Sequence, residues 1–197
     1  MWPLYLIVAM CLAPVIFALL AYYVPSLGLR PSGQTNYGAL IQPQRPMPDS
    51  TALPLRTLDD QPFDLASLKG KWILLSADSA ACPESCVKKL FILRNSHASQ
   101  GKEVERLTRV WFITDDATIP DDVMAAYKGT HMLKADPEKL AAYLAPDASA
   151  AERDAALKAP MWIIDPLGNL MMQFPADADP ISVRDDIRKL LRNSRIG

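Results

Sequence analysis

The sequence is poor in cysteine and histidine, and its first 29 residues carry no charged side chain. Three cysteines among 197 residues are too few for a small domain that disulfides hold together. The 21 basic and 22 acidic side chains leave a net charge of −1. This balance excludes a nucleic-acid binder that works through a broad basic surface, because phosphate binding needs clustered positive charge. A wholly disordered chain is also excluded, since 50% of the residues are hydrophobic.

The uncharged N-terminal segment contains an almost continuous apolar run from Trp2 to Val24. A helix of that length crosses the roughly 30 Å hydrocarbon core of a bilayer, and Pro14 is tolerated in mid-span. A cleaved signal peptide is the alternative, but a charged n-region and a small-x-small cleavage site are both missing. We therefore predict a retained transmembrane anchor over residues 1–25, in contact with membrane lipid.

Two further regions follow this predicted anchor. Residues 26–50 contain many prolines and glycines, a composition that predicts an extended linker. Residues 51–197 are the predicted folded domain, in which short apolar runs alternate with helical patterns. We expect strands at 71–76 and 109–114, a short extended piece at 132–135, a hairpin at 161–165 and 170–174, and helices at 82–100, 120–128, 137–144, 148–157 and 181–192.

Strands separated by helices indicate a partly parallel sheet that is covered on both faces. The closing hairpin and helix narrow the expectation to an α/β fold of the thioredoxin-like kind. In this sandwich a central mixed sheet is flanked by helices.

The chemistry of the chain centres on Cys82 and Cys86, at the corner between a predicted strand and a predicted helix. Four-residue spacing puts both sulfurs on one helix face, near the separation that a disulfide needs. The helix start favours a thiolate at Cys82, and Lys88 and Lys89 add to this field, so Cys86 is the resolving thiol. Two soft thiolates can also hold Cu(I), and the spacing does not separate these uses. Simple packing in the core is the third interpretation.

A proline near the closing hairpin is the remaining candidate. The bond between Ala159 and Pro160 precedes the predicted strand 161–165, where we expect a cis prolyl bond. In thioredoxin-like folds such a proline packs beside the cysteine loop and shapes the substrate groove. Pro160 therefore joins Cys82 and Cys86 as a candidate catalytic residue, although an ordinary trans proline at a strand start is the alternative.

Residues 54–195 resemble the Sco/SenC family of cytochrome oxidase assembly proteins, within the thioredoxin superfamily. The resemblance rests on the anchor, on Cys82-x-x-x-Cys86, on Pro62–Leu65 before Leu68–Trp72, on Thr114–Asp116 and on Trp162–Gly168. Members of that family hold copper with two cysteines and a distant histidine, and help to mature the dinuclear copper centre of cytochrome c oxidase. The resemblance therefore implies an oxidase subunit or another assembly protein as partner.

The histidine that this resemblance calls for is not matched. The corresponding segment, Asp154–Ala159, contains none, and His97 and His131 are the two histidines of the chain. His97 is about 16 Å of helical rise from Cys86, and His131 is expected in a surface loop. Three functions stay open: thiol–disulfide exchange without a cofactor, Cu(I) delivery by the same thiolates, and non-catalytic oxidase assembly. The missing histidine favours exchange.

Charge and cysteine chemistry disagree about the location of the domain. Arg30 and Arg45 follow the anchor, which favours a cytoplasmic domain by the positive-inside rule. A working dithiol favours an oxidising compartment instead. We give the chemistry precedence and predict a single-pass protein of the cytoplasmic (inner) membrane, with its C-terminal domain in the periplasm.

Overall fold

The computed structural model describes residues 2–24 and 35–197, and the chain divides into two compact units, Met1–Thr35 and Asn36–Gly197. The described part of the first unit is mainly helix α1 (Trp2–Tyr23), which contains Pro14 and buries none of its side chains. By length and composition α1 can cross a membrane, so the predicted apolar helix is confirmed. Residues 1 and 25 of the predicted anchor and residues 26–34 of the predicted linker lie outside the described residues.

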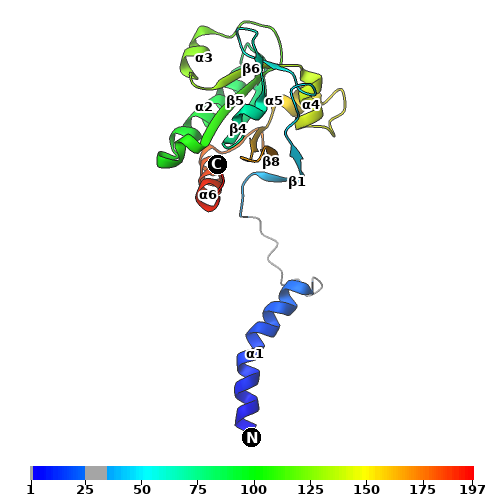
Figure 1. Cartoon of the computed structure of the whole chain (residues 1–197), viewed down its shortest axis with the longest axis vertical. Helices are drawn as coiled ribbons and strands as arrows, with labels where there is room; N and C mark the ends of the chain where they lie inside the picture. The colour runs from blue at the N-terminus through cyan, green and yellow to red at the C-terminus, as the bar shows by residue number, and fades with distance from the viewer. Residues whose placement is uncertain (1, 25–34) are drawn as a thin grey trace. The chain divides into compact units, whose positions relative to one another are not determined.

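The second unit is built on one mixed sheet of eight strands, in the order β1-β8-β7-β4-β5-β6-β2-β3 (Figure 1). The central strands β4, β5 and β6 run parallel, and the other neighbours pair antiparallel. The strands are β1 (Ala39–Pro46), β2 (Leu55–Arg56), β3 (Pro62–Phe63), β4 (Trp72–Asp78), β5 (Leu107–Ile113), β6 (His131–Ala135), β7 (Met161–Ile164) and β8 (Asn169–Phe174).

Helices cover both faces of this sheet. Figure 1 shows α2 (Glu84–Ala98) on one side and α4 (Pro137–Leu144) on the other. The core beside α2 includes α6 (Pro180–Asn193), and the core beside α4 includes α5 (Arg153–Lys158). Because both faces are covered, every residue of β4 is buried. The short elements η2 (Leu65–Leu68), η3 (Gly101–Arg106) and α3 (Asp121–Ala126) complete the unit. The predicted thioredoxin-like sandwich is confirmed.

The second half of the predicted linker is part of the sheet, which corrects that prediction. Strand β1 pairs antiparallel with β8, with a register shift between Leu40 and Arg45. Prolines are tolerated there because β1 is an edge strand, where a missing N–H removes no bond to a neighbour. Ahead of β1, the backbone N–H groups of Tyr37 and Gly38 donate to the buried carboxylate of Asp186 on α6, at 2.7 and 2.9 Å. The compact unit thus begins before residue 51.

Candidate dithiol site

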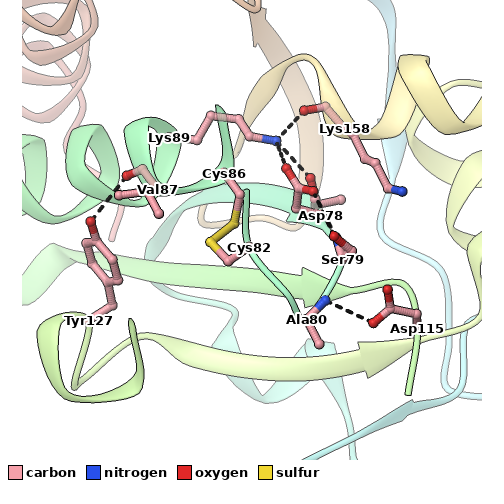
Figure 2. Close-up of a disulfide and its surroundings, with 11 residues drawn as sticks. Asp78, Ser79, Ala80, Cys82, Cys86, Val87, Lys89, Asp115, Tyr127 and Lys158 are labelled. Atoms are coloured by element: carbon pink, nitrogen blue, oxygen red, sulfur yellow. Dashed lines mark hydrogen bonds and ion pairs between the residues drawn. A yellow bond between two sulfur atoms is a disulfide. The ribbon is translucent and has the colours of Figure 1, made fainter. Parts of the chain in front are cut away.

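Cys82 and Cys86 lie where strand β4 is followed by helix α2, at the carboxyl end of the parallel strands (Figure 2). They form a disulfide with an S–S distance of 2.01 Å and a Cα–Cα distance of 5.0 Å. The predicted proximity of the two sulfurs is therefore present. Cys82 is 5% exposed and Cys86 is 1% exposed, so the site is nearly closed in its oxidised form. Cys82 is the more accessible of the two.

The prediction that both cysteines lie on one helix face is wrong, because α2 begins only at Glu84 and Cys82 therefore lies outside the helix. Pro83 is the residue that caps the helix, and a proline disfavours the right-handed helical conformation in the residue before it. Cys82 instead has a φ of 43°, in the left-handed region that non-glycine residues rarely adopt. The disulfide thus joins the first turn of α2 to the strained last residue of the loop before its cap.

Hydrogen bonds from neighbouring segments hold the loop that carries Cys82. The carboxylate of Asp115, in the connection after β5, accepts a hydrogen bond from the backbone N–H of Ala80 at 2.9 Å. Within the loop, the N–H of Cys82 donates to the carbonyl of Ser79 at 3.0 Å. On the other side of the disulfide, the hydroxyl of Tyr127 donates to the carbonyl of Val87 at 3.2 Å (Figure 2). These contacts fix the loop and the first turns of α2.

A buried ion pair that the sequence pattern does not predict lies beside the disulfide. The ammonium of Lys89 is 2.9 Å from the Oδ2 atom of Asp78, and both side chains are at most 4% exposed. The same ammonium donates to the carbonyl of Ala77 at 2.9 Å and to the carbonyl of Lys158 (Figure 2). Burial lowers the pKa of Lys89, and the hydrogen bond and charge of Asp78 oppose that shift.

The predicted contribution of Lys88 and Lys89 to a positive field at Cys82 needs correction. Lys88 is exposed and pairs with Glu84 at 2.8 Å, and Lys89 is neutralised by Asp78. One sequence signal could have indicated the buried pair: Lys89 stands three residues after Cys86 and next to Leu90, on the buried face of α2. A lysine on that face needs a partner.

Pro160 is buried at the start of β7, and its expected cis bond is not present. Among the described residues the one cis peptide bond joins Gln42 to Pro43. Pro160 follows the C-cap of helix α5 and precedes β7, a place between a helix and a strand where a trans proline is well tolerated. It lines a hollow of about 310 Å³ together with residues of α5, β8 and the α4–α5 connection. Two residues before it, the carbonyl of Lys158 accepts a hydrogen bond from Lys89 on α2, the helix that carries Cys86.

The histidines lie away from the disulfide. His97 is in the last turn of α2, and burial, followed by the charge of Arg109, lowers its pKa. His131 is the first residue of strand β6 and not part of a surface loop, which corrects the prediction. It is half-buried, and the centroid of its ring lies 5.7 Å from that of Phe63. Burial, followed by the charge of Lys71, lowers the pKa of His131 as well. Over residues 2–24 and 35–197, no three His, Cys, Asp or Glu side chains form a metal-binding group.

A mixed sheet between helices, with a disulfide at the corner after a central parallel strand, defines a thioredoxin-like thiol protein. Residues 72–194 match the model of the family described as "transmembrane-like, thioredoxin-like, C-terminal domain". The chain therefore belongs to that family. No curated protein matches the sequence.

Solved structures of Sco proteins share this fold. Apo Sco1 of Thermus thermophilus has a TM-score of 0.57 at 16% identity, over 82% of this chain and 98% of that one. Copper-bound yeast Sco1 has a TM-score of 0.53 at 15% identity, over 82% and 96%. BsSco, described as a Sco-family protein with a disulfide switch, has a TM-score of 0.56 at 13% identity, over 79% and 99%. The predicted resemblance to the Sco family is thus confirmed in fold.

Within the part of the chain that the structure describes, the reduced site offers Cu(I) two sulfur ligands but no nitrogen ligand. When reduced, Cys82 and Cys86 offer two adjacent sulfurs, which Cu(I) prefers as ligands. The segment Asp154–Ala159, where the resemblance in sequence calls for a histidine, forms most of α5 and its C-cap and holds none. The described residues therefore supply two sulfur ligands at this site and no nitrogen ligand beside them.

Proposed function

We propose that this protein is a membrane-anchored thiol–disulfide exchange protein that assists assembly of the copper centre of cytochrome c oxidase. The observation that carries the proposal is the Cys82–Cys86 disulfide at a strand-to-helix corner without a histidine nearby. The description of BsSco, which names both a disulfide switch and oxidase assembly, supports the same direction. The client is then an oxidase subunit or another assembly protein.

The reduced protein begins the reaction at Cys82, which is the more exposed cysteine. Its thiolate attacks one sulfur of a client disulfide, and the other client sulfur leaves as a thiolate. Cys86 then loses its proton and attacks Cys82, which breaks the mixed disulfide and frees the client. Two electrons pass to the client, and the two thiol protons end on the client sulfurs. Pro160 positions the client chain beside the cysteine loop.

The location that we propose is the periplasmic side of the cytoplasmic membrane, with α1 as the membrane anchor. A disulfide persists in an oxidising compartment, whereas cytosolic reductants keep thiols reduced. A membrane-impermeant maleimide applied to intact spheroplasts tests this orientation after mild reduction. Labelling of Cys82 supports a periplasmic domain, and labelling only after lysis contradicts it.

The central experiment uses the full chain in detergent micelles, reduced and then freed of reductant. We expect it to reduce a disulfide-containing peptide with the loss of two protein thiols per event. The variant Cys82→Ser loses the reaction completely. The variant Cys86→Ser stops at a mixed disulfide, which a mass spectrum detects. A wild-type protein whose thiols persist with the peptide disulfide contradicts exchange.

A second candidate is Cu(I) delivery by the same two thiolates, which the copper-bound Sco structures favour. Titration of the reduced chain with Cu(I) against a chelator separates the two functions. A tight one-to-one complex that Cys82→Ser abolishes supports delivery, and weak binding with a measurable dithiol potential supports exchange. If the Cys82→Ser, Cys86→Ser double variant still supports oxidase assembly in cells, the protein is a non-catalytic assembly factor.

A further inference from the structure

Lys89 contacts three segments that meet at the exchange site. Its ammonium bonds the carboxylate of Asp78 and the carbonyl of Ala77 at the end of β4, both at 2.9 Å. It also donates to the carbonyl of Lys158, the last residue of α5, which stands two residues before Pro160. The Lys158 side chain itself pairs with Asp154, so only its carbonyl faces Lys89.

The position of Lys89 relates these contacts to both functional segments. Lys89 lies three residues after Cys86, and both are buried, so they share the inner face of α2. In the β4–β7 register Ser76 pairs with Met161. Pro160, the residue before Met161, therefore lies next to the end of β4, just ahead of the loop that carries Cys82.

We propose that Lys89 is a positioning residue for exchange with polypeptide disulfides, because it holds the Lys158–Pro160 segment against the helix that carries Cys86. The inference rests on the proposed exchange function and adds a substrate class to it. In the exchange that we propose, a client polypeptide lies along the segment that contains Pro160 while its disulfide meets Cys82. A small disulfide needs only the sulfur of Cys82.

This difference between substrates provides the test. The full chain in micelles, reduced and freed of reductant, is mixed either with a synthetic peptide closed by one disulfide or with bis(2-hydroxyethyl) disulfide. The loss of protein thiols gives the rate constant for each. We expect Lys89→Met to lower the rate with the peptide about tenfold or more, since small displacements of a positioned group cost that much. The rate with the small disulfide stays at the wild-type value.

Two further variants complete the design. Lys102→Met removes a lysine that is 91% exposed and should change neither rate. Because Lys89→Met leaves Asp78 buried without its partner and can unfold the chain, the double variant Asp78→Asn, Lys89→Met is measured as well. It leaves no charge at the site of this ion pair but still removes the ammonium donor to Lys158. We expect it to show the same selective loss with the peptide.

The outcomes separate the two proposals. If the folded double variant reacts with the peptide as fast as Lys102→Met does, the positioning role is wrong and exchange stands. If its two rates fall by the same factor, Lys89 acts on the dithiol or on the fold in general, which also overturns the inference. If the wild-type chain does not react with the peptide disulfide at all, the proposed function fails and takes this inference with it.

Discussion

The two ends of helix α2 carry different chemistry. Its first turn holds Cys86, joined to Cys82, with the buried pair of Asp78 and Lys89 beside it. Its last turn holds His97, which is half-buried within the field of Arg109. Eleven residues of helix keep the sulfur and nitrogen ligands apart, about 16 Å of rise. One helix thus keeps apart the sulfur and imidazole groups that a combined Cys–His copper site would need together, and this favours sulfur chemistry at the first end.

The largest expected effect is a loss of stability at the end of α2 that carries Cys86. Two neighbouring lysines, Lys89 and Lys88, provide the variant and its control. Lys89→Met should lower the free energy of unfolding by about 3–5 kcal/mol, because it leaves the buried carboxylate of Asp78 without a partner. Lys88→Met should cause no measurable change, since its pair with Glu84 is exposed to solvent. Urea unfolding of both variants measures the difference. Equal midpoints for the two variants would contradict a buried ion pair.

Reduction of the disulfide should have the next largest effect. Opening the Cys82–Cys86 bridge, with a sequence separation of four residues, frees a short loop in the unfolded chain. The chain-entropy relation gives a loss of about 2 kcal/mol in the free energy of unfolding. Urea unfolding with and without dithiothreitol measures it. The Cys82→Ser, Cys86→Ser variant is the control and should not respond to the reductant; a wild-type chain that also fails to respond would contradict the prediction.

A smaller effect is expected from the histidines. Burial lowers the pKa of His97 and of His131 below the unfolded value of about 6.5. The unfolded chain therefore binds more protons as the pH falls below about 6.5, and stability should decrease until the folded-state pKa is reached. Thermal unfolding at a series of pH values measures this slope. His97→Gln should flatten it, and a slope that stays unchanged in His97→Gln and His131→Gln would exclude both groups as its source.

The last prediction is that two substitutions of histidine have no effect on thiol chemistry. His97→Gln and His131→Gln should leave the rate of thiol exchange unchanged, and should not alter whatever Cu(I) affinity the reduced chain has. Neither ring lies in a metal-binding group with the cysteines among the described residues. A chelator competition with each variant checks this expectation. Weaker Cu(I) binding in His131→Gln would contradict the expectation, because it would mean that the start of β6 reaches the dithiol.

The central elements were predictable because their residues are buried in continuous runs. Strands β4 and β5 and the β7–β8 hairpin lie where the apolar segments place them. The edges of the sheet were not predictable: β1 contains prolines typical of a linker, and β2 and β3 are two residues long. Such edges depend on pairing with distant strands rather than on local preference.

The candidate site was predictable in its sulfurs but not in its surroundings. The four-residue spacing and the strand-to-helix corner identified Cys82 and Cys86. The effect of Pro83 on the preceding residue was available from the sequence and would have placed Cys82 outside the helix. The contact between Lys89 and Lys158 was not available, because it joins residues 69 positions apart that only the folded sheet brings together.

The left-handed backbone conformation of Cys82 lowers the stability of the fold at the same residue that supplies the attacking sulfur. Glycine adopts a φ of 43° without the steric penalty that a Cβ atom brings there. In a chain whose disulfide is already reduced, replacing Cys82 by glycine should therefore raise the free energy of unfolding. The same replacement would remove the attacking sulfur. In the reduced chain, selection for stability alone would therefore favour glycine at position 82 over the cysteine that exchange requires.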